Sequence, residues 1–202
     1  MALEWHLHVL RNPYAQTVPD ASFIELVRQS VEARAADVER RSRSGEFGRD
    51  SMGFVVLDPT AARSKRSEEV VLLVASVGPE GARFVPNASA KAFEHWDLGA
   101  DCGVLVYTQN HRLADGRFGF GFSVELDGTI VGASGESELQ DRFQAVSLAA
   151  ELNYRIGAAR SVWEEGGRQE WYSVPSRPDA PYAEVWSMQG LANLSGSPGI
   201  AP

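Results

Sequence analysis

The sequence predicts an α+β domain in which helices pack on an antiparallel sheet. Residues 118–126 alternate between apolar and small or polar side chains, and residues 129–133 form a second strand-like run after Asp127-Gly128. An Asp-Gly pair suits the two positive-φ positions of a tight hairpin turn, so the two strands are expected to be antiparallel neighbours. Helical periodicity before and after this hairpin predicts the helices, and the short connections between the elements favour an antiparallel arrangement.

Residues 1–19 are predicted to form an irregular segment with one short strand near Trp5, and the first long helix follows it. Ser22 and Glu25 have the spacing of a capping box, which marks a helix start. Apolar residues then recur at spacings of three or four, as they do on one face of a helix. The residues expected to face the core are Ile24, Val27, Val31, Ala35 and Val38.

The sequence pattern in the middle of the chain predicts two strands and a short helix. Residues 52–58 form one strand, and the β-branched run within 69–77 is typical of a strand that is buried on both faces. Asn87 is the expected N-cap of a helix over 88–98, and Gly99 can end that helix in the left-handed conformation.

A second long helix is expected after the hairpin. Ser137 and Gln140 form another capping box. The apolar residues that recur after it at spacings of four, three and four are expected to face the core, and they are Leu139, Phe143, Val146 and Ala150. The chain therefore divides into an N-terminal segment (1–19), an α+β domain (20–157) and an irregular extension (158–202) that is rich in aromatic residues, proline and glycine.

Composition narrows the class of protein. The 202 residues carry a formal net charge of −8, which argues against general nucleic-acid binding and against docking on anionic membranes. A single cysteine excludes an internal disulfide and fits a reducing compartment. The N-terminus lacks the pattern of a signal peptide, and no apolar run is long enough for a membrane span. We therefore expect a cytoplasmic protein.

The last predicted unit resembles the GlcG/HbpS-like family. In that family a strand with a Val-Gly segment leads into Ser-Gly, four variable residues and a Gln-Asp pair that opens the last helix. Residues 131–135 and Gln140-Asp141 have this pattern, and Lys91-Ala92 and Gly99 match the family's middle helix. The resemblance covers residues 20–156. It implies a sheet with helices, assembly into symmetric homo-oligomers and, in some members, haem binding.

Two histidines are candidate ligand-binding residues. His95 shares a helical face with Lys91, and an imidazole can serve as a haem axial ligand or as a general base. The alternative for His95 is a surface or partly buried histidine without a site role. His111 lies in a polar loop after a buried strand, where both site residues and solvated residues are common.

The Ser134-Gly135 corner is the second candidate, because a strand ends there and a helix begins. Backbone amides at a helix start favour an anion such as a carboxylate, and a glycine allows close approach of a ligand. Arg142 can pair with the same anion, or it can be an ordinary solvated arginine. The corner can also be a tight turn in which only small residues fit.

No metal site is predicted, since His6 and His8 share a strand face without a visible third ligand, and Cys102 is interpreted as a buried, unreactive thiol. We expect an oligomeric protein that binds haem or a similar flat, carboxylated small molecule. An enzyme of a catabolic pathway that acts on a small carboxylated or aromatic metabolite is the first alternative. A non-catalytic oligomeric accessory subunit is the second.

Overall fold

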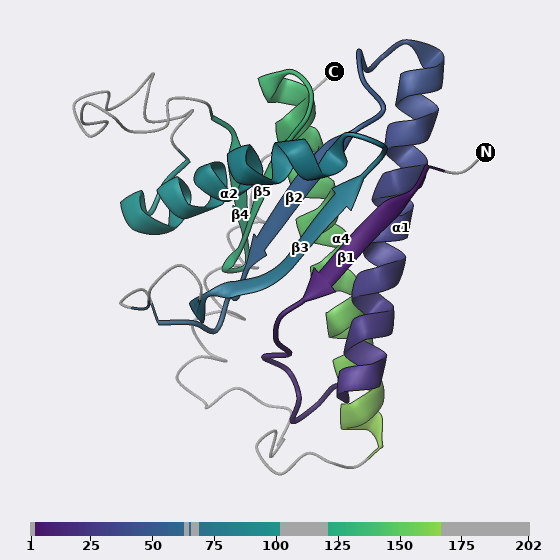
Figure 1. Cartoon of the computed structure of the whole chain (residues 1–202). Helices are drawn as coiled ribbons and strands as arrows, with labels where there is room; N and C mark the ends of the chain where they lie inside the picture. Colours follow the sequence, from purple (N-terminus) through teal and green to yellow (C-terminus); the bar gives the residue numbers. More distant parts are fainter. Residues whose placement is uncertain (1–2, 63–64, 66–68, 102–120, 167–202) are drawn as a thin grey trace, which may run out of the picture. The chain divides into compact units, whose positions relative to one another are not determined.

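A computed structural model describes residues 3–62, 65, 69–101 and 121–166 of the chain (Figure 1). The elements in this part are β1 (Trp5–Val9), α1 (Asp20–Ser44), β2 (Met52–Leu57), β3 (Val71–Val77), α2 (Gly81–Leu98), β4 (Ser123–Leu126), β5 (Thr129–Ser134) and α4 (Glu138–Glu165).

The strands of the described part form a five-stranded sheet in the order β1-β3-β2-β5-β4, and each neighbouring pair is antiparallel. The predicted α+β class is therefore confirmed. The predicted hairpin joins β4 to β5, and Asp127 and Gly128 have φ angles of 49° and 80°. β1, which lies in the predicted N-terminal segment, is the edge strand beside β3. Of the strand predicted over 118–126, residues 118–120 lie outside the described residues.

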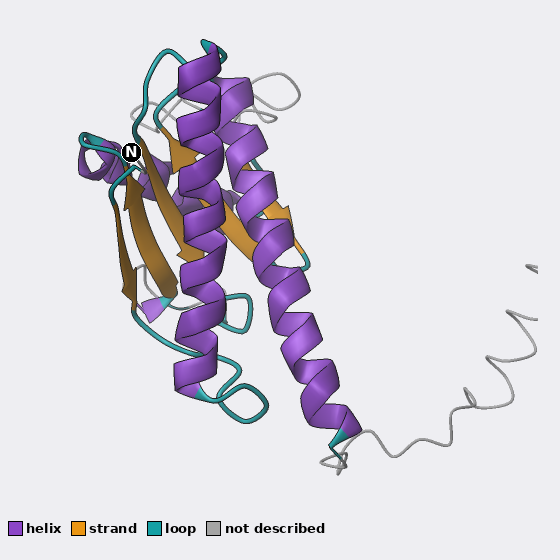
Figure 2. Ribbon diagram, turned by 90° about the vertical axis from the view of Figure 1, so that its right-hand side faces the viewer, coloured by secondary structure: helices purple, strands orange, loops and turns teal. Residues whose placement is uncertain are grey.

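Helices cover both faces of the sheet. Figure 2 shows α1 and α4 side by side on one face, and α2 crosses the other face in Figure 1. The larger core lies under α1 and α4, where it contains Phe54 and Leu73 from the central strands. A smaller core lies under α2, around Val55 and Ile130. The two sets alternate along the strands, because successive strand residues point to opposite faces.

The predicted core stripe of α1 is largely confirmed. Val27, Val31 and Val38 are fully buried, and Ala35 is nearly so. The first position is wrong, because Ile24 is 49% exposed and its neighbour Phe23 is buried in its place.

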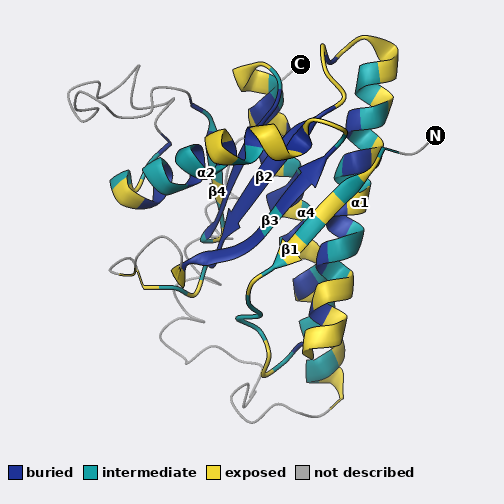
Figure 3. Ribbon diagram, viewed as in Figure 1, coloured by how far each residue is buried: buried dark blue, intermediate teal, exposed yellow. Residues whose placement is uncertain are grey.

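The predicted core stripe of α4 is wrong in all four positions. Leu139 is 72% exposed, and Phe143 and Val146 are also exposed on the outward side of the helix. Ala150 is exposed as well. The residues of α4 that pack into the core are Ala145, Leu148, Ala149, Leu152 and Ile156. The error arises because α4 has apolar residues on both faces, so spacing alone does not identify the inner one. Figure 3 shows burial along all the helices. α4 also continues past residue 157, the predicted end of the domain.

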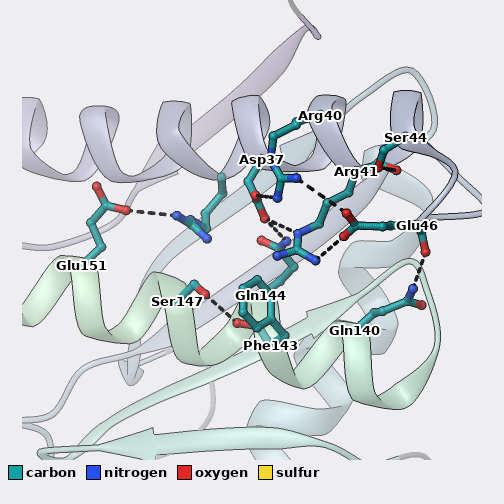
Figure 4. Close-up of polar contacts among 11 residues, drawn as sticks. Asp37, Arg40, Arg41, Ser44, Glu46, Gln140, Phe143, Gln144, Ser147 and Glu151 are labelled. Carbon is teal, nitrogen blue, oxygen red and sulfur yellow. Dashed lines mark hydrogen bonds and ion pairs between the residues drawn. The ribbon is translucent and has the colours of Figure 1, made fainter.

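Polar contacts tie α1 to α4 along the groove between them (Figure 4). Asp37 of α1 accepts a hydrogen bond from the Gln144 side chain of α4 at 2.7 Å and another from Arg41 at 2.8 Å. Farther along, the Arg34 guanidinium lies 3.3 Å from the Glu151 carboxylate. These contacts fix how the two helices align on the sheet.

α2 begins earlier than predicted, at Gly81, so Asn87 lies inside the helix and is not its N-cap. Pro86 also lies within the helix. The predicted end is confirmed, since Gly99 has φ 65°. α2 sits very close to the sheet, because a Cβ on Gly132 would lie 2.0 Å from the Ala88 carbonyl oxygen. A Cβ on Gly53 would meet the α2 backbone at 2.5 Å. These two glycines therefore set the position of α2 over the sheet.

Candidate functional site

A pocket of about 260 Å³ opens beside the corner where β5 ends and α4 begins. Of the residues predicted to bind a ligand, Lys91, Ser134 and Gly135 line it. Ser134 faces the α2 side of the sheet, since it alternates with Gly132 on β5. Among the described residues, the lining consists of Arg49, Phe84, Asn87, Lys91, Gly121, Ser134, Gly135, Glu136, Glu138 and Asp141.

A buried ion pair lies at the base of the pocket. The Lys91 ammonium donates to Asp141 Oδ2 at 2.6 Å and to the Ala133 carbonyl oxygen at 3.0 Å. The two charged side chains are only 3% and 4% exposed. An ammonium group has three N–H donors, so one remains for a group in the pocket. The close approach of α2 to β5 is what brings Lys91 to this corner.

Asp141 has two roles at the corner. Its Oδ1 atom accepts the Glu136 backbone N–H at 2.9 Å, while Oδ2 accepts from Lys91. Burial raises the pKa of Asp141, and the Lys91 charge and hydrogen bond act in the opposite direction. Buried charged groups with a shifted pKa at a pocket wall are enriched at binding and catalytic sites.

Two of the backbone amides at this corner have acceptors in the chain. The Glu136 N–H is bonded to Asp141, and the Ser137 N–H donates to Gln140 Oε1 at 3.2 Å. The second of these contacts is one half of the predicted capping box. The Glu136 and Ser137 amides are therefore engaged within the chain, whereas the N–H groups of the first turn of α4, from Glu138, have no acceptor within the helix.

Gly135 is explained by packing. A Cβ at this position would lie 2.4 Å from the Ser51 carbonyl oxygen and 2.8 Å from Met52 Cγ. The missing side chain thus leaves room for the segment that enters β2. This packing fits the alternative of a tight turn in which only small residues fit, and we expect Gly135→Val to disrupt the corner.

Arg49 is one of the pocket residues that sequence reasoning missed, as are Asn87 and Asp141. Its Nη1 atom donates to the Gly135 carbonyl oxygen at 2.7 Å, and its guanidinium carbon lies 5.7 Å from the centre of the Phe84 ring. The Glu136 carboxylate accepts from the Gly48 and Arg49 backbone amides, which fixes this loop against the corner. The loop before β2 is an ordinary polar connection in sequence, and no pattern there points to a site.

Two uncharged donors complete the pocket. The Ser134 hydroxyl and the Asn87 carboxamide line it without a side-chain hydrogen-bond partner among the described residues. The Glu138 carboxylate is exposed at the rim. Lys91, Arg49, Ser134 and Asn87 therefore present donors from three different parts of the chain to one small volume.

His95 is buried away from this lining. Its Nδ1 atom is 2.9 Å from the Ser123 hydroxyl, and its Nε2 atom is 3.3 Å from a Glu125 carboxylate oxygen. The residue is 6% exposed, and both ring nitrogens have partners in the chain. Because an axial histidine uses a ring nitrogen to bind iron, His95 in this arrangement does not fit a haem ligand.

Arg142, another predicted ligand residue, is not in the pocket lining. Arg142 is exposed, with its guanidinium carbon 5.5 Å from the centre of the Phe122 ring. His111 lies outside the described residues. Within the described ranges, no group of three or more metal-binding side chains occurs. None of the helices in that same part of the chain has the length and apolar character needed to span a membrane.

Comparison with known proteins gives a distant likeness to solved structures. No protein-family model and no curated protein matches the chain. Among solved structures, the chain is similar to Klebsiella pneumoniae protein ORFY, a DUF336 protein, at 17% sequence identity and a TM-score of 0.41. The likeness covers 62% of this chain and 88% of that one. DUF336 is the GlcG-like family, but a likeness of this size leaves the family of this chain unassigned.

Proposed function

We propose that the protein binds a small carboxylated molecule in the pocket between α2 and the β5–α4 corner. The observation that carries the proposal is the Lys91 ammonium, which is held in place by Asp141 and the Ala133 carbonyl oxygen with one donor left over. A positioned cation with a free N–H at a pocket wall suits a carboxylate, since hydrogen bonds between charged groups are stronger than those between neutral groups.

The remaining lining supports the same ligand class. The Ser134 hydroxyl and the Asn87 amide supply uncharged donors near Lys91, and Arg49 supplies a second cation. The Phe84 ring provides an apolar wall on which a flat group can lie. A few convergent polar groups beside an apolar surface are the usual composition of a small-molecule site.

The size of the pocket favours a metabolite over haem. Ligand pockets commonly measure about 300–1,000 Å³. At about 260 Å³ this pocket lies below that range and suits a molecule of few atoms. Haem is the alternative ligand of the proposal. Haem ligation through His95 requires that the imidazole leave Ser123 or Glu125, and a Soret band that appears on haem titration and disappears in His95→Ala is the result that favours it.

Calorimetric titration with a panel of small carboxylic acids and their neutral amides tests the proposal. We expect an acid to bind and its matched amide to bind at least tenfold more weakly. Ser134→Ala should weaken acid binding about tenfold, because a hydrogen bond to a charged group contributes about 1.5–3 kcal/mol. Arg142→Gln is the matched control, since Arg142 is exposed and not in the lining, and it should bind as the parent does.

The Lys91→Met variant needs a partner substitution, because it would leave Asp141 buried without its cation. Breaking a buried ion pair costs about 3–5 kcal/mol of stability. The double variant Lys91→Met/Asp141→Leu removes both charges, and we expect it to fold and to lose acid binding. Full binding by a folded double variant contradicts the proposal.

Catalysis is a second candidate for the same pocket. Asp141 is a buried carboxylate with a raised pKa, 2.6 Å from an ammonium group. Such a pair can exchange a proton with a bound molecule, which is general acid–base chemistry. An enzyme is favoured over a binding protein if the parent protein converts a bound acid to a product and the Asp141→Asn variant does not.

A further inference from the structure

The charges around the pocket at the β5–α4 corner do not match a purely anionic ligand. Among the described residues that line the pocket, two are cationic, Lys91 and Arg49, and three carry carboxylates, Glu136, Glu138 and Asp141. Lys91 and Asp141 form one buried ion pair. The carboxylates in this lining therefore outnumber the cations, and a ligand whose only charge is a carboxylate would add to the excess of negative charge.

The charges are also separated by depth. Lys91 and Asp141 are nearly fully buried at the base of the pocket, whereas Glu138 is exposed at its rim. Glu138 and Asp141 are three residues apart on α4, so they share one face of the helix, with about 5–6 Å between their Cβ atoms. The pocket thus has a cationic donor at its base and a carboxylate about one helical turn away, on the side of the solvent.

Of the three carboxylates, that of Glu138 is the one without a contact in the described part of the chain. Asp141 accepts from Lys91 at 2.6 Å, and Glu136 accepts from the Gly48 N–H at 3.1 Å. No hydrogen bond or ion pair joins the Glu138 carboxylate to any described residue. This carboxylate is therefore the acceptor that remains for a ligand.

Ser134 provides a matching donor at the base of the pocket. The residue is 6% exposed, it lines the pocket with Lys91, and its hydroxyl has no hydrogen-bond partner among the described residues. A buried polar group normally has a partner, because burial without one is costly. The Ser134 hydroxyl and the remaining Lys91 N–H together suit the two oxygens of one carboxylate.

We propose that the ligand of this pocket is a short amino acid in its zwitterionic form. Its carboxylate accepts hydrogen bonds from Lys91 and Ser134, and its ammonium group donates to the Glu138 carboxylate. A zwitterion brings no net charge, and each of its charged groups meets a group of opposite sign. This inference rests on the proposed function, because it keeps the same carboxylate site and adds the group that occupies the rim.

Glu138 also has an ordinary interpretation. It lies in the first turn of α4, where the helix dipole stabilises an acidic side chain, and it can occur there for that reason alone. In that case, removal of its charge changes the stability of the fold and leaves ligand preference as it was. The experiment therefore measures ligand preference and melting temperature on the same variants.

Calorimetric titration of the full chain with matched ligands tests the inference. The probes are L-alanine, L-leucine and L-phenylalanine, the α-hydroxy acid that corresponds to each, and the carboxamide of each amino acid. The hydroxy acid lacks the ammonium group, and the carboxamide lacks the carboxylate. For at least one side chain, we expect the amino acid to bind about tenfold more tightly than either matched compound, because each of these loses a hydrogen bond between charged groups.

Glu138→Gln separates the effect of the charge on binding from its effect on the fold. The substitution keeps the size of an exposed side chain and removes its charge. It should weaken amino-acid binding about tenfold, and it should not weaken hydroxy-acid binding, because the rim then repels an anion less. Glu32→Gln is the matched control, since it removes the same charge from an exposed position on α1, outside the pocket lining, and it should change neither affinity.

Hydroxy acids that bind as tightly as their amino acids overturn the inference, while the carboxylate pocket of the proposed function stands. An equal loss of both ligand classes in Glu138→Gln also overturns it, as does a fall in melting temperature without a change in ligand preference. A carboxamide that binds as tightly as its amino acid contradicts the carboxylate site, and therefore the proposed function as well. If none of the acids binds, both fail together.

Discussion

The two long helices on one face of the sheet, α1 and α4, differ in how many of their sides are apolar. α1 has one apolar side, which is buried, and one charged side, which holds exposed ion pairs. α4 has a buried apolar side around Leu148 and Leu152 and a second apolar side that is exposed. When a helix has a single apolar stripe, its sequence alone shows which side faces the core. When a helix has two apolar stripes, the sequence does not distinguish the inner side from the outer one.

This difference explains why one core prediction succeeded and the other failed. In α1 the outer charges left only one possible inner face. In α4 the inner face contains two polar residues, Asp141 and Gln144, which made it less apolar in sequence than the exposed side. Both polar residues have partners, in Lys91 and Asp37. Buried polar groups that pair with other elements thus made the true core face of α4 hard to recognise in the sequence.

The largest expected effect comes from the two leucines on opposite sides of α4. Leu148→Ala should lower the free energy of unfolding by about 2–5 kcal/mol, because it leaves a cavity in the core. Leu139→Ala should change it by less than about 0.5 kcal/mol, as surface substitutions do. Denaturant unfolding of both variants measures the two effects. Equal losses would mean that both sides of α4 are buried within one chain.

A smaller effect is expected at Asp37, in the groove between the helices. Burial acts to raise the pKa of Asp37, but hydrogen bonds from Arg40, Gln144 and Arg41 outweigh it and hold the pKa below its usual value. A lowered folded-state pKa gives stability that is present above the unfolded pKa and is lost as pH falls through the folded pKa.

Denaturant unfolding at pH 7 and below about pH 4 checks whether the lowered pKa of Asp37 stabilises the fold. About pH 4 is the relevant limit because it lies near the pKa of an aspartate in the unfolded chain. The parent should lose more stability over that interval than Asp37→Asn, by less than about 1 kcal/mol, since the side chain is partly solvated. Identical pH profiles would show that the groove contacts do not align α1 and α4 through this charge. Glu32→Gln, on the outward side of α1, is a suitable control variant.

The smallest effect is expected on the outward side of α1. Hydrogen bonds from Arg28 and then Gln29 lower the pKa of Glu25 to about 2. An NMR titration of the Glu25 carboxyl should show this value, and Arg28→Ala should return it toward that of an ordinary glutamate. The melting temperature should hardly change, because the pair lies at the solvent-exposed surface of α1. A large loss of stability would mean that this side of α1 is covered in solution.

Local patterns in the sequence determined the elements of this fold. The Asp127-Gly128 turn, the helix end at Gly99 and the inner stripe of α1 around Val31 follow from backbone preference and from spacing. These features depend on residues that are close together in the chain, so they are visible without the tertiary structure. Lys91 and Ser134 were also selected as ligand residues before the fold was known, and both line the pocket.

Tertiary structure alone decided which residues meet. Arg49 reaches the pocket because β2 lies next to β5, and Lys91 meets Asp141 because Gly132 lets α2 approach the sheet. His95 was separated from the pocket by the same packing, through its contacts with Ser123 and Glu125 of β4. Each of these contacts joins residues that are far apart in sequence, where neither spacing nor propensity carries information. The side of α4 that faces the sheet likewise depends on the contacts of Asp141 with Lys91 and of Gln144 with Asp37, and not only on its apolar content.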